Sequence, residues 1–366
     1  MKKFCIISFC NMYVLPYAKT YIKQISDSGS ECTLLFWDRD SVNGANDNYP
    51  NCRKLCYQRK MTPESSAKDK IQGYFEATRY FRKVIKTEKF DGLIFLQTHA
   101  AIACGSVLSK RYQHKYIVDI RDFTLEDYWL YRGLEKKVIN GSYATIISSP
   151  AYRKFLPDHE YVIAHNYTPF PTEQINAIRD HLVKETAEPI GISFVGTVRF
   201  IEMDKKVLKL FANDDRFCLN YFGTGSDVLK NFCGEQGIKN VQFYGSFSPD
   251  MTVSFYERTN IINNLYGNHN KFLDYALSNK LYHAGQFHMP ILVCPDTYME
   301  EVSQKYGMGF VLDVDDVEGP NKVLVWYSNI DRIALGKGCD SFIESVRRDN
   351  QKFYATIMDF VQGHEG

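Results

Sequence analysis

The sequence predicts an α/β protein with two Rossmann-like, doubly wound parallel-sheet domains that face each other across a cleft. Three observations support this prediction. The chain has 366 residues, short apolar runs alternate with longer amphipathic ones, and the alternation is interrupted once, near residue 170. A chain of this length is too long for a single ordinary hydrophobic core, so two domains are expected. Alternating strands and helices are typical of parallel sheets.

The first half of the chain contains five apolar runs with the length of buried strands: FCIISF, ECTLLFW, GLIFLQ, YIVDI and ATIISS. Helical stretches lie between them, for example over 16–26 and 68–86. Five apolar residues of the second stretch share one helical face, namely Ile71, Tyr74, Phe75, Val84 and Ile85. We expect this face to cover the sheet. Together these elements predict a first domain over 1–170.

A second series of strands follows the proline-containing segment AHNYTPFPTEQ. Its apolar runs are GISFVG, CLNYFG, VQFYG, IINNLY, PILVC and GFVLDV. These runs predict a second domain over 188–338. The last helical stretch, 339–363, has no strand after it, so we expect it to pack back on the first domain.

Composition excludes several classes of protein. A formal net charge of +1 gives no support to a nucleic-acid partner, which usually requires a strongly basic face. The ten cysteines are scattered without Cys-x-x-Cys spacing, which is typical of reduced thiols in a cytoplasmic protein. Nowhere does the sequence carry an uncharged apolar run of about 18 residues, so we expect no membrane-spanning segment.

The carboxyl ends of the strands are the expected ligand sites of doubly wound sheets. The first strand is followed by CNMY, which lacks the glycine pattern of a dinucleotide-binding turn. Asp38 and Asp40 in WDRD could form a metal site, but the spacing is common by chance, and we favour a site without metal. Arg121 and Asp122 follow YIVDI and are candidates for the acceptor side, unless they only pair with each other. His99 is a weaker candidate, because it is also placed to cap the helix that follows it.

The second half carries the stronger signals. Gly196 ends a strand, and Gly223 and Gly225 form a turn after the next one, where a ligand can approach the backbone closely. Arg199 and Lys205 follow the first of these glycines. Both cations could equally be solvated charges at the start of a helix.

The stretch SNKLYHAGQFHMPILV combines a helix start with a lysine. Ser278 can cap the helix, which leaves backbone amides and a partial positive charge at its mouth. Asn279 and Lys280 follow directly, and Lys280 adds a full charge to this anion-ready end. The sequence therefore predicts a site for a pair of phosphates, unless Lys280 too is only solvated.

These motifs resemble the family 4 glycosyltransferases of GT-B fold, and in particular the bacterial capsule and exopolysaccharide subgroup. The subgroup pattern is Pro/Ser-Asn-Lys-Leu-Phe-Glu-Tyr, followed by Gly-x-Pro and an apolar strand. VDIRD, GLEKKVINGSYATIISSP and VIAHN in the first half are similar to other subgroup motifs. The likeness covers nearly the whole chain. His283 stands where the pattern has a glutamate that commonly holds the donor ribose.

The resemblance implies a hexosyltransferase-type enzyme that moves a sugar from a nucleotide-sugar to a hydroxyl, with retention of configuration and without a metal or other cofactor. By carry-over, Arg199 and Lys205 steady the donor diphosphate, Asn279 and Lys280 lie beside it, and His283 faces the nucleotide. Gly196, Gly223 and Gly225 line the donor site. Asp122 is the carboxylate that we expect nearest to the acceptor hydroxyl.

The resemblance also implies a glycan or lipid-linked acceptor in surface polysaccharide synthesis. The basic stretch TRYFRKVIKTEKF could then hold the protein peripherally on the cytoplasmic face of the membrane, although a helix that covers a sheet has the same pattern. Two other functions stay open at this point. One is a catalytically inactive sugar-nucleotide-binding subunit, suggested by the missing glutamate, and the other is a nucleotide-sugar 2-epimerase.

Overall fold

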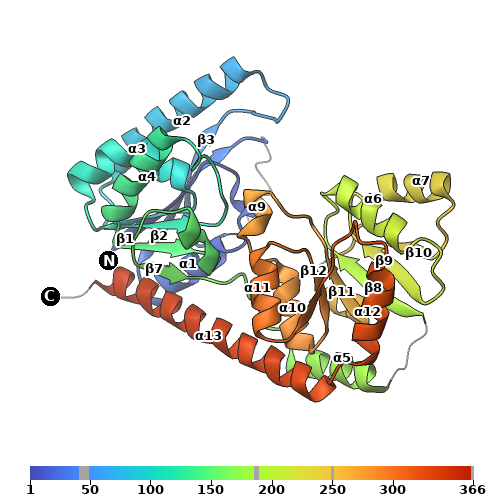
Figure 1. The fold of residues 1–366 in the computed structure, drawn as a ribbon. Coiled ribbons are helices and arrows are strands. Elements are labelled where there is room, and N and C mark those ends of the chain that lie inside the picture. Colours follow the sequence, from blue (N-terminus) through green and yellow to red (C-terminus); the bar gives the residue numbers. More distant parts are fainter. Residues whose placement is uncertain (41–48, 185–188, 249–250, 364–366) are drawn as a thin grey trace. The chain divides into compact units, whose positions relative to one another are not determined.

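The structure is a computed structural model that describes residues 1–40, 49–184, 189–248 and 251–363. Contacts divide the chain into two compact units, which are drawn in Figure 1. Unit 1 comprises Met1–Asn166 together with the chain from Arg348 onward, and unit 2 comprises Tyr167–Arg347. The predicted start of the second domain at residue 188 lies outside the described residues.

Unit 1 contains a seven-stranded, entirely parallel sheet with the order β3-β2-β1-β4-β5-β6-β7. The strands are β1 (Lys3–Ser8), β2 (Glu31–Asp38), β3 (Arg53–Gln58), β4 (Gly92–Phe95), β5 (Tyr116–Ile120), β6 (Ala144–Ile147) and β7 (Tyr161–Ile163). The five predicted strands are confirmed. The two that the sequence did not predict, β3 and β7, are the edge strands, whose short or polar sequences lack a continuous apolar run.

Helices cover both faces of this sheet, as a parallel sheet requires. One layer consists of α2 (Ala67–Glu88), α3 (Thr98–Arg111) and α4 (Trp129–Asn140), which pack in that order (Figure 1). On the other face, α1 (Ala18–Asp27) and the last turns of α13 share a core with β1 and β2. Two short 3-10 helices, η1 (Met12–Val14) and η3 (Pro150–Lys154), follow strand ends.

The predicted core face of α2 is partly wrong. Val84 and Ile85 are buried, but Ile71 is 72% exposed and Phe75 is 70% exposed. The buried stripe instead runs through small residues, because a side chain on Gly73 would lie only 2.9 Å from the indole of Trp37. In its first turns the helix approaches β2 through glycine, Ile71 and Phe75 point outward, and the ring of Tyr74 packs at 5.4 Å from that of Trp37.

Unit 2 contains a six-stranded parallel sheet with the order β10-β9-β8-β11-β12-β13. Its strands are β8 (Ile190–Val195), β9 (Phe217–Phe222), β10 (Val241–Phe243), β11 (Ile261–Asn264), β12 (Ile291–Val293) and β13 (Gly309–Val311). All six predicted apolar runs are confirmed as strands. The predicted fold class, two Rossmann-like parallel-sheet domains, is therefore confirmed.

Two apolar cores lie on the two faces of this second sheet. The helices of unit 2 are α5 (Thr172–Lys184), α6 (Ile201–Leu210), α7 (Asp227–Gln236), α8 (Thr252–Tyr256), α9 (Lys271–Asp274), α10 (Asn279–Phe287), α11 (Tyr298–Lys305), α12 (Gly319–Ser328) and the first part of α13 (Arg332–Gln362). Helix α13 starts seven residues before the predicted helical stretch. Its residues Leu335–Val346 lie in a core of unit 2, and Phe353–Val361 lie in the core of unit 1.

Candidate functional site

Two glycine turns touch at the carboxyl ends of β8 and β9. The amide of Gly196 donates to the carbonyl of Phe222 at 2.8 Å. Gly196 and Gly223 have φ values of +138° and +139°, and a Cβ on Gly223 would lie 1.9 Å from the carbonyl oxygen of Gly196. Gly225 has a φ of +85°, and a Cβ there would lie 2.8 Å from the carbonyl of Val198. Only glycine fits these positions, so a ligand at this edge meets bare backbone.

The start of α10 is capped as predicted. Ser278 is extended, and its Oγ accepts a hydrogen bond from the amide of Lys280 at 3.3 Å. Asn279 is exposed at the first helical position. Because the remaining first-turn amides of a helix have no partner within the helix, its mouth attracts negative charge.

The side chain of Lys280 is buried, with 3% of its surface exposed. Its Nζ donates to the hydroxyl of Tyr266 at 2.5 Å and lies 4.1 Å from the ring centre of Phe194. A Cβ on Gly196 would lie 3.7 Å from this nitrogen, so the ammonium sits at the glycine turn. Within the described residues, no carboxylate lies at ion-pair distance from Lys280. A buried cation whose contacts in the described residues are a hydroxyl and aromatic faces favours an anionic ligand.

A buried acid, Asp204, lies in the same region on α6. It is 2% exposed, and its Oδ1 has no hydrogen-bond partner in the described part of the protein. Burial raises the pKa of Asp204 to about 7, although the nearby Tyr221 hydroxyl and the Lys280 ammonium act in the opposite direction. The sequence analysis missed Asp204 and Tyr266. No sequence signal could have identified Asp204, because it stands in the ordinary polar run EMDKK.

The predicted basic pair lies at the start of α6, with Arg199 in the loop before the helix and Lys205 in the helix. Arg199 is exposed in the loop before this helix. The Nζ of Lys205 pairs with Glu202 at 2.8 Å and lies 5.6 Å from the ring centre of Phe232. The structure thus brings Lys280 to the glycine turns, whereas it gives Lys205 a local partner.

His283 lies one turn after Lys280 on α10. Its Nδ1 is 2.7 Å from the hydroxyl of Tyr256, and its ring packs against that of Phe170. Burial, with a smaller effect of the Lys280 charge, lowers the pKa of His283 to about 4, so the ring is neutral at physiological pH. The Tyr256 hydroxyl is fully buried, and Nδ1 is its only hydrogen-bond partner among the described residues. We therefore assign Tyr256 as the donor to Nδ1, which places the ring proton on Nε2.

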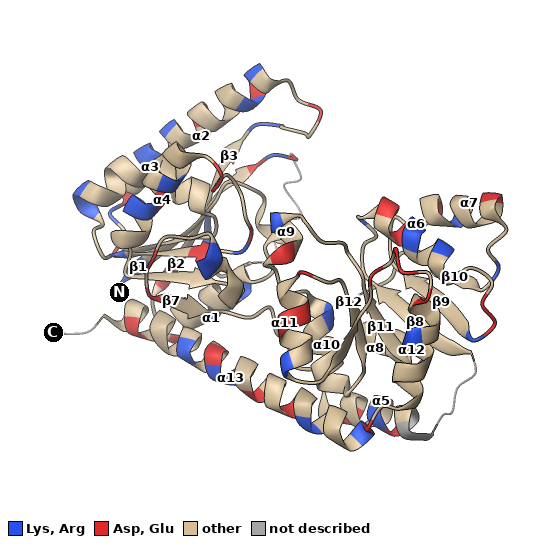
Figure 2. Ribbon diagram, viewed as in Figure 1, with Lys and Arg blue, Asp and Glu red and all other residues tan. Residues whose placement is uncertain are grey.

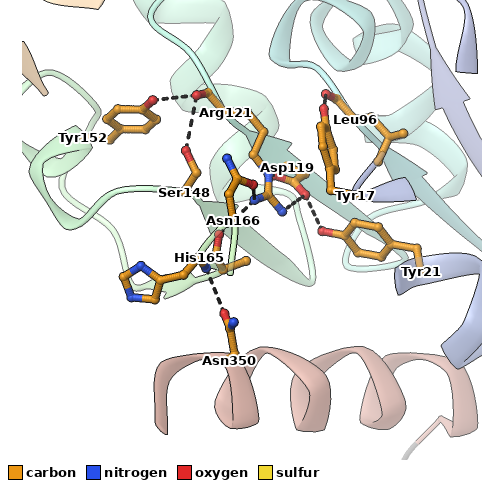
Figure 3. Close-up of polar contacts among 11 residues, drawn as sticks. Tyr17, Tyr21, Leu96, Asp119, Arg121, Ser148, Tyr152, His165, Asn166 and Asn350 are labelled. Atoms are coloured by element: carbon orange, nitrogen blue, oxygen red, sulfur yellow. Dashed lines mark hydrogen bonds and ion pairs between the residues drawn. The ribbon is translucent and has the colours of Figure 1, made fainter. Parts of the chain in front are cut away.

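In unit 1, Arg121 is part of a closed polar network, which Figure 3 shows. Its guanidinium makes two hydrogen bonds to Asp119, at 2.7 and 2.9 Å, and two more to the carbonyl of Ala164 and the side chain of Asn166. It also lies 4.4 Å from the ring centre of Tyr17. Arg121 thus pairs with Asp119, and it fixes the end of β5 to the segment that leaves unit 1.

The other two acceptor-side candidates are more accessible. Asp122 is exposed directly after β5. His99 is half-buried in the first turn of α3 and packs against the rings of Phe9 and Tyr74. The expectation that His99 caps α3 is wrong, because the N-cap residue is Gln97. Burial and the charge of Arg39 lower the pKa of His99 to about 4.

The two aspartates of WDRD have protein partners. Asp38 accepts a hydrogen bond from Asn11 at 2.7 Å, and Asp40 accepts one from Tyr13 at 2.5 Å. Over the residues that the structure describes, no group of three or more His, Cys, Asp and Glu side chains is placed to hold a metal ion. In the same part of the chain, no helix has the length and apolar character needed to cross a bilayer.

Comparison with solved structures defines the class of fold. Sucrose-phosphate synthase from Thermosynechococcus elongatus is similar at a TM-score of 0.67 and 12% identity, covering 99% of this chain and 98% of that chain. HepE from Anabaena in complex with UDP is similar at a TM-score of 0.66 and 11% identity, covering 98% and 99%. WaaG, a glycosyltransferase involved in lipopolysaccharide biosynthesis, is similar at a TM-score of 0.62 and 10% identity, covering 99% and 100%.

These neighbours are GT-B glycosyltransferases, and the two parallel-sheet domains therefore form the GT-B fold. No family model matches the sequence. No curated protein matches it either.

Proposed function

We propose that the protein is a glycosyltransferase that moves a sugar from a nucleotide-sugar donor to a hydroxyl group of a glycan. One observation carries the proposal. Lys280 places a buried ammonium, with no carboxylate partner in the part of the chain that the structure describes, beside the Gly196 turn at the mouth of the capped helix α10. Similar folds support it, since HepE has been solved with UDP and with UDP-glucose and WaaB is a galactosyltransferase.

The donor diphosphate would lie against the glycine turns and the first amides of α10. Gly196, Gly223 and Gly225 allow it to approach the backbone, and Asn279 and Lys280 lie beside it. Arg199, in the loop before α6, and Lys205, on α6, would add charge once Lys205 leaves Glu202. Donors aimed at the leaving diphosphate stabilise the charge that develops as the sugar departs. His283 would donate from Nε2 to an oxygen of the nucleoside.

The reaction breaks the bond between the anomeric carbon and the diphosphate and forms a bond to the acceptor oxygen. The acceptor proton would pass to Asp122 or to an oxygen of the donor phosphate. His99 is a second acceptor-side candidate, as a neutral ring that can bind a sugar hydroxyl. The family resemblance supports a hexosyl donor and retention of configuration.

We further propose that no divalent metal takes part, because the ammonium of Lys280 and the backbone amides at the start of α10 would already neutralise the negative charge of the diphosphate. Exhaustive chelation should then leave the transfer rate unchanged. A rate that chelation abolishes and magnesium or manganese restores would contradict metal independence.

The acceptor is proposed to be carried on a lipid at the cytoplasmic face of a membrane, in the synthesis of a surface polysaccharide. The resemblance to the capsule and exopolysaccharide subgroup supports this part. The basic residues of α2 support it as well, because Arg79, Arg82, Lys83 and Lys86 line a shallow groove on that helix.

The first experiment is a thermal-shift panel with uridine, guanosine, adenosine and cytidine diphosphates, followed by calorimetry with the nucleotide that stabilises the protein. Lys280→Met keeps the apolar stem but removes the charge, and should weaken binding at least roughly 10-fold. Lys206→Met is the matched control, because Lys206 is exposed and pairs with Asp315. Equal binding by both variants would contradict the donor site.

Transfer to an extract of lipid-linked acceptors separates the enzyme from the two alternatives. A binding subunit would bind nucleotide and transfer nothing to any acceptor. A nucleotide-sugar 2-epimerase would convert its substrate without an acceptor. Sugar incorporation that requires both donor and acceptor would exclude both alternatives.

A further inference from the structure

The start of α4 exposes an unusual number of large apolar side chains. Five of the ten residues over 125–134 are large, apolar and exposed, namely Leu125, Tyr128, Trp129, Leu130 and Leu134. Trp129 is 82% exposed and Leu130 is 59% exposed. Single exposed apolar residues are normal on proteins, but a contiguous group marks a contact surface.

The core does not need these residues. Helix α4 packs against α3, and its buried residues are Glu135, Val138 and Ile139. The exposed apolar residues therefore lie on the part of the segment that turns away from the core. Ile71 and Phe75 on α2 repeat this arrangement in the same helical layer.

The same layer is strongly basic. Helices α2, α3 and α4 together contain eleven Lys and Arg residues and only four Asp and Glu residues, although the whole chain has a formal charge of +1. On the opposite face, α1 and residues 348–362 contain four basic and three acidic residues. Figure 2 shows the basic residues along α2, α3 and α4.

Two of the four acidic residues are already neutralised by cations outside the layer. Glu76 pairs with Arg59, and Glu88 pairs with Arg53, both at 2.5 Å. A third, Glu135, is buried. The charge that this layer presents to a partner is therefore positive.

We propose that the α2–α3–α4 layer docks on an anionic lipid bilayer, with Tyr128, Trp129 and Leu130 entering the interface. Trp and Tyr prefer the headgroup region of a bilayer, and aliphatic side chains enter the acyl boundary. Lys and Arg nearby are attracted to anionic headgroups. The positive charge of the layer thus favours an anionic partner. The exposed Tyr128, Trp129 and Leu130 favour a bilayer over a soluble polyanion, because a soluble polyanion has no apolar interior that could take up these side chains.

This inference rests on the proposed function and names the partner that presents the acceptor. Asp122, the proposed acceptor-side carboxylate, precedes Leu125 by only three residues. Docking through this segment would therefore bring the end of β5 to the surface that carries a lipid-linked acceptor.

Trp129 supplies a direct readout that needs no activity. The chain has three tryptophans, of which Trp37 is fully buried and Trp326 is half-buried. Vesicles of phosphatidylglycerol and phosphatidylcholine should therefore shift the emission of the full-length protein to the blue through Trp129. Trp129→Phe should remove the shift. No shift in the unmodified protein, or the same shift in the variant, would overturn the proposal.

Charge variants test the basic part of the surface by vesicle sedimentation. Lys136→Glu with Lys137→Glu changes two exposed residues of α4 and should weaken binding at least roughly 10-fold. Lys19→Glu with Lys352→Glu makes the same change of charge on the opposite face and should leave binding intact. Binding should also fall steeply with salt and be weak on phosphatidylcholine alone. Equal weakening by both double variants would refute a docking face.

Nucleotide binding and sedimentation velocity distinguish failure of the docking proposal from failure of the proposed function and from self-association. If nucleotide binding persists while vesicles do not bind, only the docking proposal fails, and the proposed glycosyltransferase function stands. Sedimentation velocity without lipid tests a second copy as the partner. If the protein forms a dimer, and the double variant Trp129→Ser, Leu130→Ser is a monomer, then the surface serves self-association and the lipid assignment is overturned.

Discussion

The hydroxyl of Tyr256, the last residue of α8, lies 2.7 Å from Nδ1 of His283, which stands one turn after Lys280 on α10. The buried hydroxyl donates to Nδ1, so Nε2 carries the proton. His283 therefore offers a donor at the position where the resembling family has a glutamate, which can only accept. A nucleotide bound as proposed would therefore have to present a hydrogen-bond acceptor to Nε2.

Tyr256→Phe should release the ring of His283 from this tautomer. We expect two tautomers in the ¹⁵N spectrum of the ring and a nucleotide affinity lowered by roughly 3- to 10-fold, because one hydrogen bond is worth about 1 kcal/mol. Tyr116→Phe is the control, since it removes a buried hydroxyl bonded at 2.6 Å to Val138 in unit 1. Both variants should lose similar stability, and only the first should lose affinity. A single Nε2–H tautomer in Tyr256→Phe would remove Tyr256 from this role.

Arg121→Ala should destabilise the protein by roughly 3 to 5 kcal/mol, because it leaves the carboxylate of Asp119 buried without its charge partner. Arg53→Ala breaks a similar two-contact pair with Glu88, but Arg53 is exposed, so the cost should stay below about 1 kcal/mol. Urea denaturation measures both. Similar costs would show that burial does not decide the strength of the Arg121 pair.

Glu135 should make stability fall as the pH rises from about 4.5 to 8. Burial, and then the neighbouring Glu126, raise the pKa of Glu135 to about 8. The folded protein holds this proton, whereas the unfolded chain releases it near its ordinary pKa, so unfolding releases a proton throughout this window.

Glu135→Gln removes this titration and keeps the shape. At pH 8 the variant should be more stable than the unmodified protein by about 1 to 3 kcal/mol, and near pH 4 the two should be equal. Glu31→Gln, at an exposed residue of β2, is the control and should change little. Parallel stability curves for Glu135→Gln and the unmodified protein would mean that Glu135 is ionised in the folded state.

Asp122→Asn should leave nucleotide binding intact and lower the transfer rate by roughly 100-fold or more if the carboxylate takes the acceptor proton. The residue lies in unit 1, whereas Lys280 lies in unit 2, so their variants should fail in different assays. Calorimetry and transfer to lipid-linked acceptors measure the two effects. Transfer at full rate would instead assign the proton to the donor phosphate.

The sequence predicted the strands of both sheets except the two edge strands of unit 1. All six strands of unit 2 follow from apolar runs, because a buried parallel strand must be apolar on both faces. Strand β3 was missed because it is half-exposed at the edge and carries polar residues, and β7 because it has only three residues. The face of α2 was partly misjudged for a related reason, since Gly73 and Ala77 pack on the sheet and carry little apolar signal.

Only those features of the candidate site that depend on neighbouring residues in the chain could be predicted from the sequence. The positive φ values at Gly196, Gly223 and Gly225 and the cap at Ser278 are local features of the backbone. The surroundings of Lys280 are not, because Phe194, Tyr266 and Asp204 reach it from other elements. Arg121 was a candidate for the acceptor side, with a pair to Asp122 as the alternative, but it bonds to Asp119 and to two residues more than 40 positions away.

The sequence by itself determined the two parallel sheets, the glycine turns and the capped helix, because hydrophobic periodicity and backbone conformation act over a few neighbouring residues. Only the tertiary structure decided which charges are buried, which are paired and which apolar side chains remain exposed. Among the described residues Lys280 has no carboxylate partner, Arg121 bonds to three other residues of unit 1, and Trp129 is exposed. Each of these states depends on residues distant in sequence, whose packing sets the burial and electrostatics of every side chain.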